Sequence, residues 1–106
     1  MNKFNKKKIK EPSIEEIMSI KNLINSGKFV EAEKKTKLYT VKYPHSFNLL
    51  NVLGVSLIAQ KKFAEAKKIY TSLIKIKPNF AEVYNNLANI YMEENNNDEA
   101  IYYFEK

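Results

Sequence analysis

Asparagine side chains are the groups in this chain whose type and spacing could perform binding chemistry. Among 106 residues there are 13 Asn, and Asn85, Asn86 and Asn89 fall within five consecutive positions. Because an Asn side chain both donates and accepts hydrogen bonds, a row of them can hold a peptide backbone whatever its sequence. These three residues are therefore candidate peptide contacts. The whole chain is rich in Asn, and a solvated polar surface explains them equally well.

Other residue types give no sign of catalysis, metal binding or cofactor binding. The chain has no Cys, and its single His, His45, has no second imidazole or thiolate with which to share a metal. No nucleophile stands in a pattern with a base, and two Gly are too few to build a phosphate-binding loop. We therefore expect no enzyme activity, no metal and no cofactor.

The net charge of +6 is concentrated near the N-terminus. All 18 basic residues are Lys, which lack the planar fork that binds phosphate in bidentate fashion. The residues before the first acid, Glu11, have low hydrophobicity and include Lys3, Lys6, Lys7, Lys8 and Lys10. We interpret residues 1–12 as a disordered basic tail, with contact to nucleic acid or anionic lipid as the less favoured alternative. No nucleic-acid partner is expected.

The distribution of apolar residues indicates in which cellular compartment the protein resides. No apolar run approaches the roughly 20 residues that a membrane-spanning helix needs. The N-terminal Lys residues are not followed by the apolar region that a secretory signal would have. We therefore expect a cytoplasmic protein with no membrane span.

Helix signals divide the chain into six segments. Ser13 and Glu16 have the spacing of a capping box, so the first helix should begin at Ile14. Gly27 and Pro44 mark helix ends, since Gly tolerates a left-handed backbone and proline disfavours a helical residue before it. The expected helices cover residues 14–25, 29–42, 47–60 and 63–76, a fifth beginning at residue 81, and a sixth after a turn at residues 93–98.

Three finer expectations concern side chains in these helices. Asn79 paired with Glu82 should cap the fifth helix. Asn97 or Asp98 should cap the sixth helix. Leu38 should face inward from the second helix, as part of its apolar side.

The chain repeats itself at a fixed interval. Pro44 and Pro78 lie 34 residues apart. The same spacing separates Ala32, Ala66 and Ala100, and also Glu31, Glu65 and Glu99. In the central copy, the small residues Gly54 and Ala66 should let the third and fourth helices approach closely, so that a larger side chain there would force them apart. A period of about 34 residues indicates a solenoid of stacked helical repeats.

The repeated pattern resembles the tetratricopeptide repeat family. The residues that carry the resemblance are Leu50, Leu53, Gly54, Leu57, Ala66, Tyr70 and Pro78 in the central copy and Tyr84, Leu87, Ala88, Tyr91, Ala100 and Phe104 in the next. The resemblance implies an all-α fold, an alpha-alpha superhelix of three antiparallel helix pairs, the last incomplete. The pairs would occupy residues 13–46, a degenerate N-terminal cap, residues 47–80, and residues 81–106.

The family pattern also implies a concave groove lined by the first helix of each pair. In the first repeat its positions are Ile14, Ile17, Met18, Lys21, Ile24 and Asn25. In the other repeats the residues that we select as peptide-binding candidates are Asn48, Asn51, Val55, Glu82, Asn85, Asn86, Asn89 and Glu93. Val52 interrupts the row of Asn side chains, so we do not expect a continuous Asn ladder.

The resemblance favours a non-catalytic scaffold that binds a protein or peptide in its groove, within the N-terminal part of a longer protein. The last copy is similar to repeats that precede O-linked N-acetylglucosamine transferases and bacterial sulfotransferases or glycosyltransferases. The alternative is therefore a substrate-presenting region whose catalytic domain would follow residue 106. If the chain does end there, the uncovered face of the third repeat should favour homo-oligomers.

Overall fold

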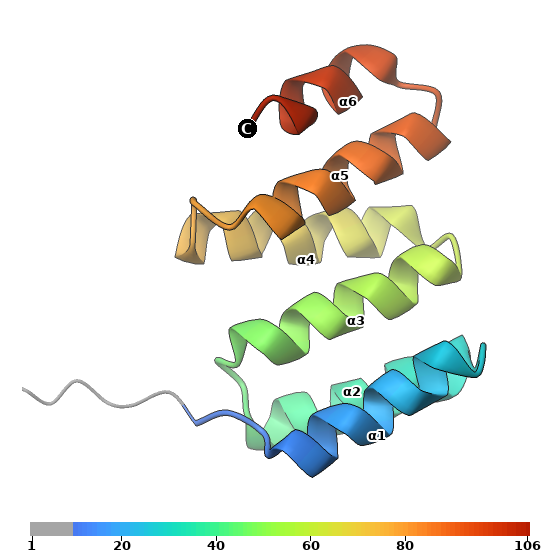
Figure 1. The fold of residues 1–106 in the computed structure, drawn as a ribbon, viewed down its shortest axis with the longest axis vertical. Coiled ribbons are helices and arrows are strands. Elements are labelled where there is room, and N and C mark those ends of the chain that lie inside the picture. Colours follow the sequence, from blue (N-terminus) through green and yellow to red (C-terminus); the bar gives the residue numbers. More distant parts are fainter. Residues whose placement is uncertain (1–9) are drawn as a thin grey trace, which may run out of the picture.

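The computed structural model describes residues 10–106, and this range folds into helices with no strand. The helices are α1 (Ile14–Asn25), α2 (Phe29–Lys42), α3 (Phe47–Ala59), α4 (Phe63–Ile76), α5 (Ala81–Glu93) and α6 (Asn97–Phe104). They form three successive hairpins stacked along one direction (Figure 1). The expected helix ends agree with these bounds to within one or two residues. Most of the predicted basic tail, residues 1–9, lies outside the described residues.

The hairpins form two layers rather than a closed bundle. Helices α1, α3 and α5 contact one another in sequence and form the inner layer, while α2 and α4 lie behind them in Figure 1. The radius of gyration is 14.8 Å, against about 13 Å for a compact domain of this length. The dimensions of 48 × 33 × 18 Å describe the same open, flattened stack. This is the arrangement of an all-α helical repeat superhelix.

The larger core cluster lies between the second and third hairpins, around Tyr70. The Tyr70 ring is fully buried and packs against α3 where Gly54 leaves room for it. A Cβ atom placed on Gly54 would lie 2.5 Å from Cζ of Tyr70. This close approach confirms the packing role predicted for Gly54. A second cluster, around Ile20, Ala32 and Leu49, joins the first hairpin to the second.

The helix caps agree with the sequence at α1 and differ at α5 and α6. The Ser13 hydroxyl accepts from the Glu16 amide at 3.1 Å, and the Ser13 amide donates to the Glu16 carboxylate at 2.8 Å. The cap predicted at Asn79 is wrong. Helix α5 begins at Ala81, so Phe80 occupies the cap position, and its side chain forms no capping hydrogen bond. At α6 the cap is Asn96, one residue before the predicted pair.

Leu38 does not face inward as predicted, and its side chain is 71% exposed. Thr36 is buried at the inward position, and its hydroxyl is satisfied by donating to the Ala32 carbonyl at 2.6 Å. Two residues along a helix correspond to about half a turn, so Leu38 must point to the opposite side from Thr36. A polar residue with a local hydrogen bond thus replaces the expected apolar contact.

The three inner helices end in the same turn, which recurs with the period of the sequence. Gly27, Lys61 and Asn95 all adopt a left-handed backbone, with φ of 76°, 61° and 63°. At each turn the next amide donates to the carbonyl five residues back, at 2.8, 2.9 and 2.8 Å. This pattern is the Schellman motif, which favours Gly at the left-handed position. Lys61 is therefore the residue at which this turn is most strained.

Replacing Lys61 by Gly should raise the free energy of unfolding by roughly 1 kcal/mol, because the left-handed conformation penalises a Cβ atom. Urea denaturation of the two proteins measures the difference. The matched control is Lys61→Ala, which keeps a Cβ and also removes the exposed ion pair between Lys61 and Glu93, at 3.7 Å. An Ala variant as stable as the Gly variant would contradict backbone strain as the cause.

Candidate binding groove

A cavity of about 510 Å³ opens on the inner layer of the stack. Its walls come from α1, from α3 and from the start of α5. We call it the inner groove, defined by Ile17, Lys21, Ile24, Asn25, Asn48, Asn51, Val52, Val55, Phe80 and Glu82. The volume lies within the range of about 300–1,000 Å³ that is usual for ligand sites.

The helical period explains why these side chains meet. Positions that recur three or four residues apart lie on one face of a helix, and the inner layer turns this face of α1 and α3 in the same direction. The half-buried side chains Ile17, Ile24, Val52 and Val55 supply apolar walls. The groove can therefore shelter apolar ligand groups while the neighbouring amides form hydrogen bonds.

Asn51 supplies the most informative polar atom of the groove. Its Oδ1 atom is buried, and no hydrogen-bond donor reaches it among the described residues. Buried acceptors are nearly always paired, because an unpaired one costs about 1–3 kcal/mol. Asn51 also lines the inner groove, so a rotation of its side chain would bring this unpaired acceptor to a ligand N–H group.

The two charged residues of the groove have opposite signs and come from different helices. Lys21 projects from α1, and Glu82 lies in the first turn of α5, with α3 between these two helices. Both side chains are exposed. A ligand lying across the inner layer would meet positive charge on the α1 side and negative charge on the α5 side, which favours one orientation of a dipolar chain.

The structure separates the predicted site residues into two groups. Asn48, Asn51, Val55 and Glu82 line the inner groove. The others lie beyond it, along α5: Asn85, Asn86, Asn89 and Glu93. Phe80 also lines the groove, and sequence reasoning missed it because it precedes the first groove position of its repeat.

Asn86 is engaged inside the protein. Its Nδ2 atom donates to the Tyr70 hydroxyl at 3.2 Å, across the contact between α4 and α5. Burial raises the pKa of the Tyr70 phenol, against the opposing effect of this hydrogen bond, so the ring stays neutral. Replacing Asn86 would therefore disturb the core, and only Asn85 and Asn89 remain as exposed amides on this part of α5.

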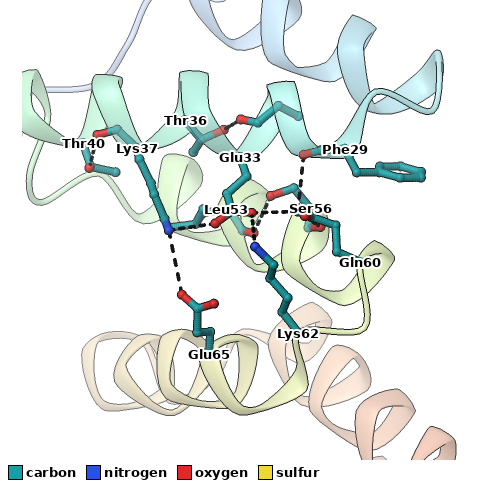
Figure 2. Close-up of polar contacts among 11 residues, drawn as sticks. Phe29, Glu33, Thr36, Lys37, Thr40, Leu53, Ser56, Gln60, Lys62 and Glu65 are labelled. Carbon is teal, nitrogen blue, oxygen red and sulfur yellow. Dashed lines mark hydrogen bonds and ion pairs between the residues drawn. The ribbon is translucent and has the colours of Figure 1, made fainter.

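Glu33 holds the first two hairpins together through a polar network (Figure 2). Its carboxylate accepts from Lys37 at 2.7 Å, from Gln60 at 2.8 Å and from Lys62 at 3.0 Å. Gln60 also donates to the Ser56 carbonyl at 3.0 Å. These partners come from α2, from the turn after α3 and from the start of α4. The network therefore sets the position of α3 behind the groove.

The hydrogen bond from Lys37 is the largest cause that lowers the pKa of Glu33, to about 2. Burial opposes this shift, and the bonds from Gln60 and Lys62 reinforce it. The carboxylate is thus ionised and fully occupied by its partners at neutral pH. We assign it to structure and not to acid–base chemistry.

The described residues lack two further kinds of site. No group of three or more His, Cys, Asp or Glu side chains is placed to hold a metal ion within residues 10–106. His45 is exposed on the turn after Pro44. None of the helices from α1 to α6 has the length and apolar character needed to cross a membrane.

Part of the chain matches a known protein family. Residues 57–105 match the family model described as Tetratricopeptide repeat. The matched segment runs from the end of α3 to the end of α6 and includes the whole of the third hairpin. No curated protein matches the chain.

Proposed function

We propose, from the match of residues 57–105 to the tetratricopeptide repeat, that the inner groove binds an extended peptide segment of a partner protein. Repeats of this kind form protein-interaction scaffolds whose stacked helices present a concave surface. The finer proposal, that the ligand is a peptide and that it lies in the groove between α1, α3 and α5, is supported by the chemistry of the groove.

The buried Oδ1 atom of Asn51 is the observation that carries this proposal. An extended peptide exposes backbone N–H groups that α-helices use internally, so it can offer a donor to this acceptor. The adjacent apolar walls, including Ile24 and Val52, can take side chains on either side of that donor. A ligand without N–H or O–H donors would leave the Asn51 acceptor unpaired and bind more weakly.

Replacing Asn51 by Leu should weaken peptide binding by about tenfold while leaving the protein as stable as before or more stable. Binding would lose one buried hydrogen bond, whereas folding would lose an unpaired buried acceptor. Peptides selected from a displayed random library supply the probe, and fluorescence anisotropy with one labelled peptide measures affinity. Thermal denaturation measures stability on the same samples.

The matched control is the double variant Asn85→Ala, Asn89→Ala, which removes two exposed amides of α5 that lie outside the groove. It should bind the same peptide with unchanged affinity. If this variant loses affinity and Asn51→Leu does not, the peptide lies along α5, as the sequence first suggested, and the groove proposal is wrong.

A further inference from the structure

The outer face of α2 carries an apolar stripe that the packing of the hairpins does not use. Val30, Leu38 and Val41 are 55%, 71% and 82% exposed. Lys34 lies among them, since positions 30, 34, 38 and 41 share one face of a helix. We call these four residues the α2 stripe. Exposed aliphatic residues gathered on one face indicate a contact surface more strongly than the same residues scattered singly.

The second hairpin provides an internal comparison for the α2 stripe. The residues one repeat later, on α4, are Ala64, Lys68, Ser72 and Lys75. The fold therefore accepts small and polar side chains at these positions, and the lysine in the middle is common to both helices. The aliphatic side chains are a property of α2 alone, and packing of the repeat does not require them.

We propose that the α2 stripe inserts into the surface of an anionic lipid membrane. This contact is separate from the inner groove and goes beyond the peptide-binding proposal. Aliphatic side chains would enter the boundary between headgroups and acyl chains, as in helices that lie in the membrane interface. Lys34 would extend its stem along the apolar stripe and place its ammonium group among the phosphates.

The shape of this face favours lipid over a protein partner. The inner groove and a smaller cavity of about 280 Å³ among α4, α5 and α6 both lie elsewhere, and neither is lined by a residue of α2. Protein partners gain most affinity from side chains that fill pockets, whereas a fluid bilayer adapts to a ridge. A protein interface would also have to bury Lys34, at the cost of desolvating its charge.

The charges around the stripe favour an anionic surface and disfavour a second copy of this chain. Lys68, at the position of α4 equivalent to Lys34, adds positive charge to the same outer layer. Lys37 is paired with Glu33 at 2.7 Å, and Glu31 is the exposed acid of α2. Two α2 helices packed face to face would bring Lys34 against the lysines of the other copy. Anionic headgroups attract the same lysines.

Co-sedimentation with lipid vesicles tests the proposal. The full chain should bind vesicles of phosphatidylcholine containing about 30% phosphatidylserine and should not bind phosphatidylcholine alone. The triple variant Val30→Ala, Leu38→Ser, Val41→Lys gives α2 the residues of α4. It should bind at least about tenfold more weakly, although Val41→Lys adds a positive charge, because apolar insertion is lost. Circular dichroism verifies that the variant is folded.

Two further variants complete the design. The reciprocal change Ala64→Val, Ser72→Leu, Lys75→Val builds a second stripe on α4 and should strengthen vesicle binding although it removes a positive charge. Asn51→Leu should leave vesicle binding unchanged, so failure of the groove proposal and failure of this one are distinguishable.

Three results would overturn the inference. A full chain that does not sediment with anionic vesicles has no such surface. A triple variant that binds as tightly as the unmodified chain shows that lysines alone hold the protein. Binding to an acidic amphipathic helical peptide of Leu and Glu, lost in the triple variant and without vesicle binding, would assign the stripe to a protein partner instead.

Discussion

Replacing Gly54 by Ala should lower the free energy of unfolding by about 1–3 kcal/mol, even though the same change in an exposed helix is stabilising. The new Cβ atom would lie 2.5, 2.7 and 2.9 Å from the Cζ, hydroxyl and Cε1 atoms of Tyr70. Tyr70 is fully buried and bonded to Asn86, so its ring cannot move aside without breaking other contacts. Urea denaturation measures the loss, and Gly54→Val should lose more.

The third hairpin indicates that contact with the Tyr70 ring causes the loss of stability expected for Gly54→Ala. Ala88 follows Gly54 by one full repeat, and Phe104 follows Tyr70 by the same interval. Ala88 is accepted there in a fully buried position while Phe104 is 45% exposed. The matched change Ala88→Gly should also destabilise the protein, by roughly 1–2 kcal/mol, through helix propensity and the loss of a buried methyl group.

A double-mutant cycle tests the proposed clash. Tyr70→Leu removes the ring and should be destabilising alone, since it empties a buried site. In that background Gly54→Ala should cost much less than in the unmodified chain, so the double variant should lose less stability than the two single variants together. If the cost of Gly54→Ala were the same in both backgrounds, contact with the Tyr70 ring would not be its cause.

Replacing Glu33 by Gln should cost about 2 kcal/mol at pH 7, because the neutral amide cannot pair with Lys37 and Lys62. The expected loss is below the full value of the pKa shift, since both lysine side chains are about half exposed and are screened by water and salt. Thermal or urea denaturation measures it. Glu31→Gln, on the exposed side of the same helix, is the matched control and should leave stability nearly unchanged.

The dependence on pH gives a second signature of the same network. The pKa of Glu33 falls from 4.5 to about 2 on folding, so the unfolded chain binds more protons between these values. The stability that Glu33 contributes is therefore complete above pH 4.5 and is lost as the pH falls toward 2. The difference in stability between the unmodified protein and Glu33→Gln should shrink over this range. A difference that stays constant would contradict the assignment.

Much of the fold followed from local patterns in the sequence. The regular repeat interval and the breaks at Gly27 and Pro44 predicted the helices closely, because helix starts and ends depend on nearby residues. Errors arose where a shift of one or two positions changed a side chain's role. Asn96 replaced Asn97 as a cap because Asn95 adopted the left-handed turn, and Leu38 faced solvent because α2 packs through the side that carries Ala32 and Thr36.

The candidate site was predicted only in part. Asn51 and Glu82 line the inner groove, as the family pattern implied, while Asn85 and Asn89 lie outside it on the same inner helices. The position of a residue within its repeat can be read from one sequence. The depth of the groove at each repeat cannot be read from it. That depth depends on how far adjacent hairpins separate, which is set by contacts between residues distant along the chain.

The sequence by itself determined the repeat and the helices, because both depend on residue types at short and regular spacing. Only the tertiary structure decided which amides are free for binding and which side chains are exposed. Asn51 has a buried acceptor without a partner, and Asn86 donates its amide hydrogen to Tyr70. Asn residues at such similar positions differ because a hydrogen bond depends on what a neighbouring hairpin brings within reach. That neighbour is placed by packing across the whole stack.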